Sequence, residues 1–123
     1  MRVLIIDDSA AMRRMLAAYV GELDDVESVQ AADGQEAIDA LETQSPFDVA
    51  LVDWDMPRVN GIQFILHVRS NLKHRHLKLV MVTAHVAFED LQQALECGAD
   101  DYIMKPVTAD MLIDKFRMLG LAA

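Results

Sequence analysis

The 123-residue sequence has one cysteine, Cys97, and so cannot form an internal disulfide. It has no internal repeat, no low-complexity segment and no linker rich in Pro, Gly or Ser. No apolar run approaches the roughly 20 residues that a membrane span needs, and the apolar run at 3–6 is too short for a signal peptide. These absences exclude disulfide-stapled and membrane-spanning classes, and we expect a cytoplasmic protein in a reducing compartment.

Basic residues are scarce, with 11 Lys and Arg against 20 Asp and Glu and a formal net charge of -9. This balance argues against binding nucleic acid or an anionic membrane by charge, and it suits basic partners or cations. Hydrophobic residues make up 53% of the chain, enough to fill one core in a domain of this length. We therefore expect one domain over residues 1–123, without a separate output domain.

Short apolar runs alternate with segments of helical periodicity. The expected strands are 3–6, 26–31, 48–53, 77–83 and 102–104. The apolar residues of the intervening helices lie within 12–20, 37–41, 62–68, 91–95 and 112–119. The second run is the most polar, as in an edge strand. The alternation predicts an α/β fold, a doubly wound five-stranded parallel sheet in the order 2-1-3-4-5, as in flavodoxin-like (βα)5 proteins.

Several residues mark helix ends and buried faces. Ser9, Asp33 and Thr108 are expected N-caps, and Gly98 is an expected C-terminal stop. The residues expected to face inward on the third helix are Ile62, Ile65, Leu66 and Val68. The fourth helix is marked by Leu91, Ala94 and Leu95.

The third expected strand is fully apolar and ends abruptly in Asp53-Trp54-Asp55-Met56-Pro57. Pro57 cannot donate to a strand ladder, so the strand must stop before it. Asp53 therefore lies at the carboxyl end of a buried strand, the edge where open α/β sheets bind ligands. An Asp in this place can also serve only as a cap for the following loop, so the other strand ends decide between the two interpretations.

Polar side chains follow three further strands. Asp7 and Asp8 end the first strand, Thr83 ends the fourth and Lys105 follows the fifth. If the first and third strands are neighbours, three carboxylates crowd one edge, and their repulsion favours a bound cation. Oxygen-only ligands favour Mg²⁺. A cation, an ammonium group and a hydroxyl can together hold a phosphoryl group, with Asp53 as the nucleophile.

This set resembles the receiver domain of two-component response regulators over essentially the whole chain. The matching motifs are Asp7-Asp8, Asp53 to Pro57 with Gly61, Thr83-Ala84 and Lys105-Pro106. Within that family it is most similar to the stand-alone chemotaxis type. The resemblance implies that Asp53 accepts a phosphoryl group from a sensor histidine kinase or a phosphotransfer protein. It implies a signalling switch that catalyses only its own phosphoryl transfer and slow autodephosphorylation, not an ordinary enzyme.

The resemblance also assigns roles within the site. Asp8, Asp53 and the backbone carbonyl of Asp55 would bind Mg²⁺ directly, and Asp7 would act through water. Thr83, the Ala84 amide and Lys105 would hold the phosphoryl oxygens. Thr83 and Tyr102 would form the switch, and His85 lies where the family varies and tunes phosphate lifetime. The downstream protein would bind the face of the fourth helix, fifth strand and fifth helix, with Gln92, Gln93, Glu96 and Lys115.

Three alternatives remain open from the residues. A haloacid-dehalogenase-like phosphatase also uses Asp-x-Asp, Thr and Lys, but on its first strand, whereas Asp53-Trp54-Asp55 ends the third. A flavodoxin-like cofactor binder needs a phosphate loop after the first strand, where Asp7-Asp8 would repel the phosphate. An unphosphorylated receiver adaptor is the third. The basic segment 69–78 is expected to be a solvated loop, with partner docking as its alternative.

Overall fold

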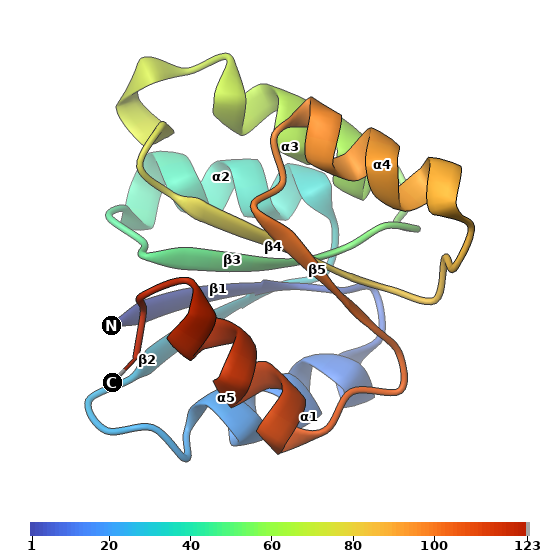
Figure 1. Cartoon of the computed structure of the whole chain (residues 1–123). Coiled ribbons are helices and arrows are strands. Elements are labelled where there is room, and N and C mark those ends of the chain that lie inside the picture. The colour runs from blue at the N-terminus through green and yellow to red at the C-terminus, as the bar shows by residue number, and fades with distance from the viewer. Residues whose placement is uncertain (123) are drawn as a thin grey trace.

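The computed structural model of the chain describes residues 1–122, which form a five-stranded parallel sheet with helices on both faces (Figure 1). The elements are β1 (Arg2–Ile6), α1 (Ala10–Val20), β2 (Glu27–Ala31), α2 (Gly34–Gln44), β3 (Val49–Asp53), α3 (Gly61–Arg69), a 3₁₀ turn η1 (Leu72–His74), β4 (Lys78–Thr83), α4 (Phe88–Cys97), β5 (Asp101–Met104) and α5 (Ala109–Met118). The strand order is β2-β1-β3-β4-β5, so the predicted fold and order are confirmed.

Alternate residues of each strand serve two cores. On β3, Val49 and Leu51 join the core that α1 and α5 cover, whereas Ala50 and Val52 join the core beneath α2, α3 and α4. All five residues of β3 are buried. This burial explains its continuous apolar sequence, because a central parallel strand has no solvent face. The strand carries Asp53 to the sheet edge as its last residue.

The edge strand β2 is the most polar of the sheet, as predicted. It pairs only with β1, and of its five residues only Ala31 is buried.

None of the described helices is long and apolar enough to cross a membrane.

The predicted helix caps are confirmed. The side chains of Ser9, Asp33 and Thr108 accept hydrogen bonds from backbone N–H groups at the starts of α1, α2 and α5. Gly98 ends α4 with φ of 120°, a conformation that favours glycine. A reciprocal capping box at the start of α3 was not predicted; in it the Asn60 and Gln63 side chains each accept a hydrogen bond from the other residue's backbone N–H.

One predicted core residue is wrong. Leu66 on α3 is 49% exposed. The buried stripe of α3 contains Gly61, Phe64, Ile65 and Val68. Those residues are spaced i, i+3, i+4 and i+7, so Leu66 must lie on the opposite face of a nine-residue helix.

Candidate functional site

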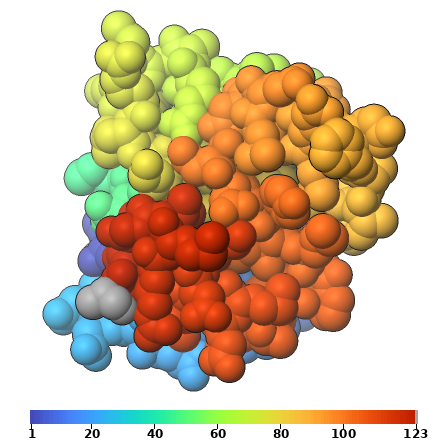
Figure 2. All heavy atoms as spheres, viewed as in Figure 1, coloured from blue at the N-terminus to red at the C-terminus, as the bar shows by residue number. Residues whose placement is uncertain are grey.

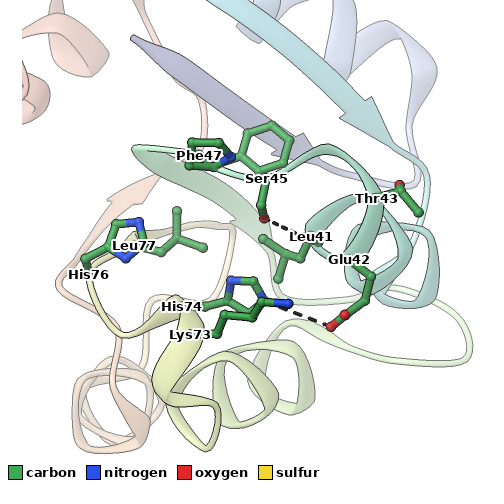
Figure 3. A pocket seen from close by; sticks show the side chains of 10 residues that line it. Leu41, Glu42, Thr43, Ser45, Phe47, Lys73, His74, His76 and Leu77 are labelled. Atoms are coloured by element: carbon green, nitrogen blue, oxygen red, sulfur yellow. Dashed lines mark hydrogen bonds and ion pairs between the residues drawn. The ribbon is translucent and has the colours of Figure 1, made fainter.

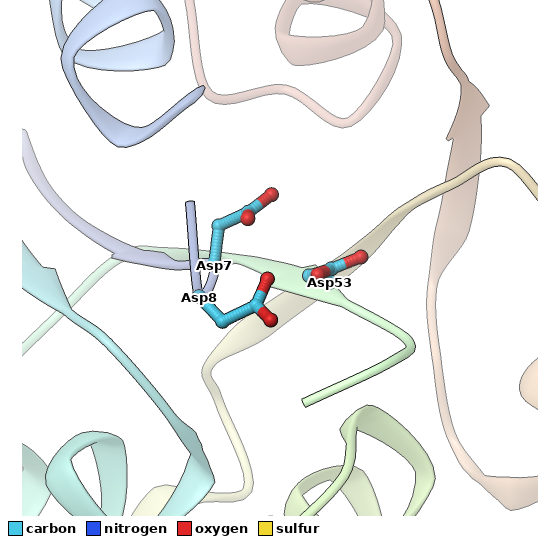
Figure 4. A group of neighbouring side chains, drawn as sticks. All are labelled: Asp7, Asp8 and Asp53. Atoms are coloured by element: carbon cyan, nitrogen blue, oxygen red, sulfur yellow. The ribbon is translucent and has the colours of Figure 1, made fainter. Parts of the chain in front are cut away.

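Three carboxylates meet at the carboxyl ends of β1 and β3. The two strands are parallel neighbours with Ile6 beside Val52, so the residues that follow, Asp7 and Asp53, lie beside each other. One oxygen each from Asp7, Asp8 and Asp53 lies within 4.8 Å of the others (Figure 4). The structure therefore brings together the acidic residues that the sequence predicted to meet.

The local chain path fixes the two acids after β1 differently. Asp7 is 2% exposed, and its Oδ1 accepts a hydrogen bond of 2.8 Å from the Ser9 N–H at the start of α1. Arg13 donates to the Asp7 backbone carbonyl at 2.6 Å. Asp8 is exposed, so its carboxylate can reach both solvent and a bound ion. Asp7 is thus a buried and hydrogen-bonded inner acid, and Asp8 is an accessible outer one.

Lys105 supplies the positive charge. Its backbone N–H donates to the Thr83 carbonyl at 2.8 Å, which ties the end of β5 to β4. The Nζ atom then lies 3.3 Å from Asp7 Oδ2 and 3.3 Å from Asp53 Oδ1. One ammonium group therefore bridges the inner acid and the central acid.

Burial dominates the electrostatics of Asp53. The residue is 7% exposed, and this desolvation, followed by repulsion from Asp7, raises the pKa of its carboxyl from 3.8 to about 6. Lys105 opposes the rise without cancelling it. In the metal-free protein the site therefore holds more negative charge than its own ammonium group neutralises.

The residues predicted to form the switch lie on β4 and β5, to one side of Asp53 on β3. Strand β4 separates β3 from β5, and Thr83 at its end is fully buried. Tyr102 on β5 is half-buried and pairs with Met81, and Ala84 is exposed just beyond β4. Thr83 thus lies between the strands of Asp53 and Tyr102, as the predicted strand order required.

The structure adds a histidine bridge that sequence reasoning did not find. The His85 ring stacks on Trp54 with centroids 4.5 Å apart and an interplanar angle of 14°. Its Nε2 lies 2.8 Å from Asp55 Oδ2, and its Nδ1 lies 3.2 Å from Asp90 Oδ2. The hydrogen bond with Asp55, together with Asp90, raises the His85 pKa against the effect of burial. The bridge joins the loop after β3 to the start of α4.

Residues 3–117 match the response regulator receiver domain family. The chain belongs to this family. It is 33% identical over 119 residues to the chemotaxis protein CheY of Pseudomonas aeruginosa, covering 97% of this chain and 95% of that protein. It is 34% identical over 115 residues to CheY-3 of Vibrio cholerae, covering 94% and 88%. The structure of the chemotaxis response regulator CheY4 of Vibrio cholerae gives a TM-score of 0.87 at 29% identity, covering 96% and 97%.

The donor set of this receiver domain fits Mg²⁺. Receiver domains generally bind Mg²⁺ at an acidic cluster, and the group here consists of carboxylate oxygens without His or Cys. Hard oxygen ligands are those that Mg²⁺ prefers, and the ion keeps several waters. The exposed Asp8 leaves room for those waters, so the residues present suit the ion.

Two close approaches hold the loop between β3 and α3 of this receiver domain. The Gly61 N–H donates to the Trp54 carbonyl at 2.9 Å, and a Cβ at position 61 would lie 2.4 Å from the Asp53 carbonyl oxygen. The Gly34 N–H donates to the Val59 carbonyl at 3.2 Å, and a Cβ there would lie 2.4 Å from that oxygen. The two glycines therefore let the loop pack against the starts of α3 and α2.

Proposed function

We propose that this receiver domain is a phosphorylation-dependent signalling switch whose acceptor is Asp53. The phosphoryl donor is a sensor histidine kinase or a phosphotransfer protein, and the pathway is of the chemotaxis type that the relatives' names state. The observation that carries the proposal is the position of Asp53. Its carboxylate lies among two further acids and 3.3 Å from the Lys105 ammonium group, at the open edge of the sheet.

The chemistry follows from these groups. A carboxylate oxygen of Asp53 attacks the phosphorus of a phosphohistidine, the P–N bond breaks, and an acyl phosphate forms. Lys105 pairs with the phosphoryl oxygens, and Thr83 and the Ala84 amide supply hydrogen-bond donors. Asp8, Asp53 and the Asp55 carbonyl would hold Mg²⁺, with Asp7 acting through water. The ion supplies charge neutralisation when it is bound.

Phosphorylation by a small donor tests the proposal directly. Incubation with acetyl phosphate and Mg²⁺ should add one phosphoryl group, measured by intact mass spectrometry, and chelation of the metal should prevent the addition. Peptide mapping after borohydride reduction should place the group at Asp53, because its carboxylate is the one centred among the other site residues. A protein that stays unmodified with both the small donor and a phosphorylated kinase would instead be an unphosphorylated adaptor.

Mg²⁺ should stabilise the fold by relieving carboxylate repulsion. At ten times its dissociation constant, a ligand that binds only the native state raises the free energy of unfolding by about 1.4 kcal/mol. We expect that increase at neutral pH and a smaller one below about pH 6, where Asp53 takes up a proton in the metal-free protein. Urea unfolding with and without Mg²⁺ measures both. Asp8→Ala should remove most of the effect, and an undiminished effect in that variant would contradict the assigned ligands.

The proposed output surface is the face formed by α4, β5 and α5, which lies toward the viewer in Figure 2. It contains an apolar groove lined by Tyr102, Ile103, Met104, Met111, Asp114, Lys115 and Met118. Gln92, Gln93 and Glu96 on α4 are exposed beside it. Lys115 is held by Asp101 at 3.1 Å, so it contributes its apolar stem to the groove. We propose that the downstream protein binds this face.

The route from Asp53 to this face passes through Thr83. Its Oγ1 accepts the His85 N–H at 2.9 Å in the unphosphorylated protein. A phosphoryl group that draws the Thr83 hydroxyl toward itself removes that acceptor from His85. The loop to α4 is then free to shift, and space beside β4 opens for the Tyr102 ring.

NMR of the Tyr102 ring, with and without a beryllofluoride phosphate mimic, tests this route. We expect the ring resonances to shift together with the His85 amide, since the Thr83 hydroxyl accepts from that amide and Thr83 lies on β4, the strand that pairs with Tyr102. Thr83→Ala should leave binding of the mimic at Asp53 detectable while removing the Tyr102 shift. A ring environment that stays unchanged, alongside clear shifts at Asp53 and Thr83, would restrict the signal to loop movement.

A further inference from the structure

Basic side chains that make no hydrogen bond or ion pair cluster at one end of this acidic domain. That end lies opposite the sheet edge that carries Asp53. Among the described lysines and arginines, four side chains make no hydrogen bond or ion pair: Arg14, Lys73, Arg75 and Lys78. Three of them, Lys73, Arg75 and Lys78, lie within the seven residues from the start of η1 to the start of β4. Arg69 begins this basic segment. Its guanidinium group donates hydrogen bonds to the Gly98 and Leu77 carbonyls and to the Asp100 carboxylate, so it is not a free surface cation. The expectation of a uniformly solvated basic loop is therefore wrong for Arg69.

A pocket of about 250 Å³ lies beside these cations, between the end of α2 and η1 (Figure 3). We refer to it as the α2–η1 pocket. Its lining residues are Leu41, Glu42, Thr43, Ser45, Pro46, Phe47, Lys73, His74, His76 and Leu77. Leu41, Phe47 and Leu77 are each at most 3% exposed and form an apolar floor. Three basic residues, Lys73, His74 and His76, also line the pocket.

His74 is the unexplained polar group of this pocket. Its side chain is 5% exposed, and its Nε2 has no hydrogen-bond partner within the described chain. A buried polar atom without a partner is destabilising by about 1–3 kcal/mol, so such atoms are rare and often indicate a missing partner. The nearest acid is Glu42, whose Oε1 lies 3.9 Å from Nε2, beyond hydrogen-bond distance. The dashed line between Glu42 and the imidazole in Figure 3 marks this approach as an ion pair, which is charged only when His74 is protonated.

We propose that the α2–η1 pocket binds a small organic anion, a carboxylate carried on a compact apolar body. The carboxylate would accept hydrogen bonds from His74 Nε2 and the Lys73 ammonium group, and the apolar body would cover Leu41, Phe47 and Leu77. The pocket is smaller than the roughly 300–1,000 Å³ of sites for drug-sized ligands, which favours a ligand of about ten heavy atoms.

The charges favour an anion over a metal ion here. Lys73 shares the wall with His74, and Arg75 and Lys78 follow within four residues, so a cation would meet unneutralised positive charge. In the part of the chain that is described, the one cluster of His, Cys, Asp and Glu with metal-ligand spacing is Asp7, Asp8 and Asp53. The histidines beside η1 are therefore better suited to donate to an anionic oxygen.

Glu42 is the group that opposes such a ligand, and it provides a sharp test. The Glu42 side chain is 48% exposed, so it can turn toward solvent when the carboxylate of the ligand enters the pocket. Removing its charge should strengthen anion binding, and removing the charge of Lys73 should weaken it. An exposed charge pair changes affinity by about two- to fivefold, which sets the size of both effects.

NMR titration of the Mg²⁺-free protein with sodium benzoate tests the proposal. We expect saturable shifts at the methyl groups of Leu41 and Leu77 and at the His74 ring, with a millimolar Kd. Lys73→Met should raise the Kd about two- to fivefold and Glu42→Gln should lower it by a similar factor. Both residues are exposed, so neither variant should impair folding.

Two matched controls separate the pocket from general charge effects. Arg14→Met makes the same charge change as Lys73→Met at an unpaired cation on α1, and it should leave the Kd unchanged. Benzamide, the neutral analogue of benzoate, should bind at least tenfold more weakly. Inorganic phosphate should shift these resonances less than benzoate, because it lacks the apolar body. The proposal is overturned if benzamide binds as well as benzoate, if shifts fail to saturate, or if Arg14→Met matches Lys73→Met.

Discussion

Replacing Asp53 with Asn should abolish phosphorylation and, at neutral pH without metal, raise the free energy of unfolding by roughly 1–3 kcal/mol. The Asp53 carboxylate, the proposed acceptor, is buried beside Asp7, and its pKa is raised to about 6. Its ionised form is therefore a source of instability that an amide of the same shape removes. Lys105 keeps a partner in the variant, because its Nζ also lies 3.3 Å from Asp7. A residue that weakens the fold while it enables the chemistry is typical of a functional site.

The stabilisation should depend on pH in a defined direction. A carboxyl whose pKa is higher in the folded than in the unfolded state contributes stability below its ordinary value near 3.8, and loses that contribution as the pH rises through about 6. The difference between Asp53→Asn and the natural protein should therefore be near zero at pH 4 and reach its full size above about pH 6. Taking the difference between the two proteins cancels groups that titrate alike in both, such as His74.

Urea unfolding across this pH range, in a chelating buffer, makes the measurement. Asp24→Asn is the matched control, since Asp24 is exposed and lies at the other end of the sheet, in the turn that precedes β2. It makes the same charge change and should shift stability by less than about 0.5 kcal/mol. Equal stabilisation in both variants would assign the effect to net charge, and phosphorylation that persists in Asp53→Asn would move the acceptor elsewhere.

The fold could be predicted because its strands are buried on both faces. The continuous apolar run before Asp53 and the polar residues of β2 distinguish a central strand from an edge strand by composition alone. The helix faces were less predictable. Leu66 and Leu95 are apolar yet exposed, and a leucine on a short helix does not by itself reveal which side meets the sheet. The spacing of Gly61, Phe64, Ile65 and Val68 was the better signal on α3.

The meeting of Asp7, Asp8, Asp53 and Lys105 was predictable for a topological reason. The carboxyl ends of parallel strands lie at one edge of the sheet, so the residues at the carboxyl ends of β1, β3 and β5 converge whatever path the loops take. The His85 bridge was not predictable, because it requires two loops of unknown path to place Asp55 and Asp90 on either side of one ring. The α2–η1 pocket has the same origin, since His74 meets Glu42 only after α2 and η1 have packed.

Gly61→Ala should destabilise the fold and slow phosphorylation at Asp53 without changing any charged group. The added Cβ would lie 2.4 Å from the Asp53 carbonyl oxygen and 3.0 Å from the Trp54 Cα, and both of these are backbone atoms that cannot rotate away. The loop must then move off the start of α3, stretching the Gly61 N–H bond to Trp54. We expect a loss of about 1–3 kcal/mol in the free energy of unfolding. Phosphorylation by acetyl phosphate should slow by about tenfold to a hundredfold, because a displacement near 1 Å misplaces the nucleophile.

Gly34→Ala separates misplacement of the acceptor from simple destabilisation. Its Cβ would lie equally close, 2.4 Å, to a carbonyl of the same loop, but at Val59 rather than at Asp53. Both variants should lose similar stability, measured by urea unfolding under conditions where each remains folded. Phosphorylation per folded molecule should fall much further in Gly61→Ala, since only there does the overlap fall on the residue that carries the nucleophile. Equal losses of phosphorylation in the two variants would show that Gly61 acts through the stability of the loop and not through the position of Asp53.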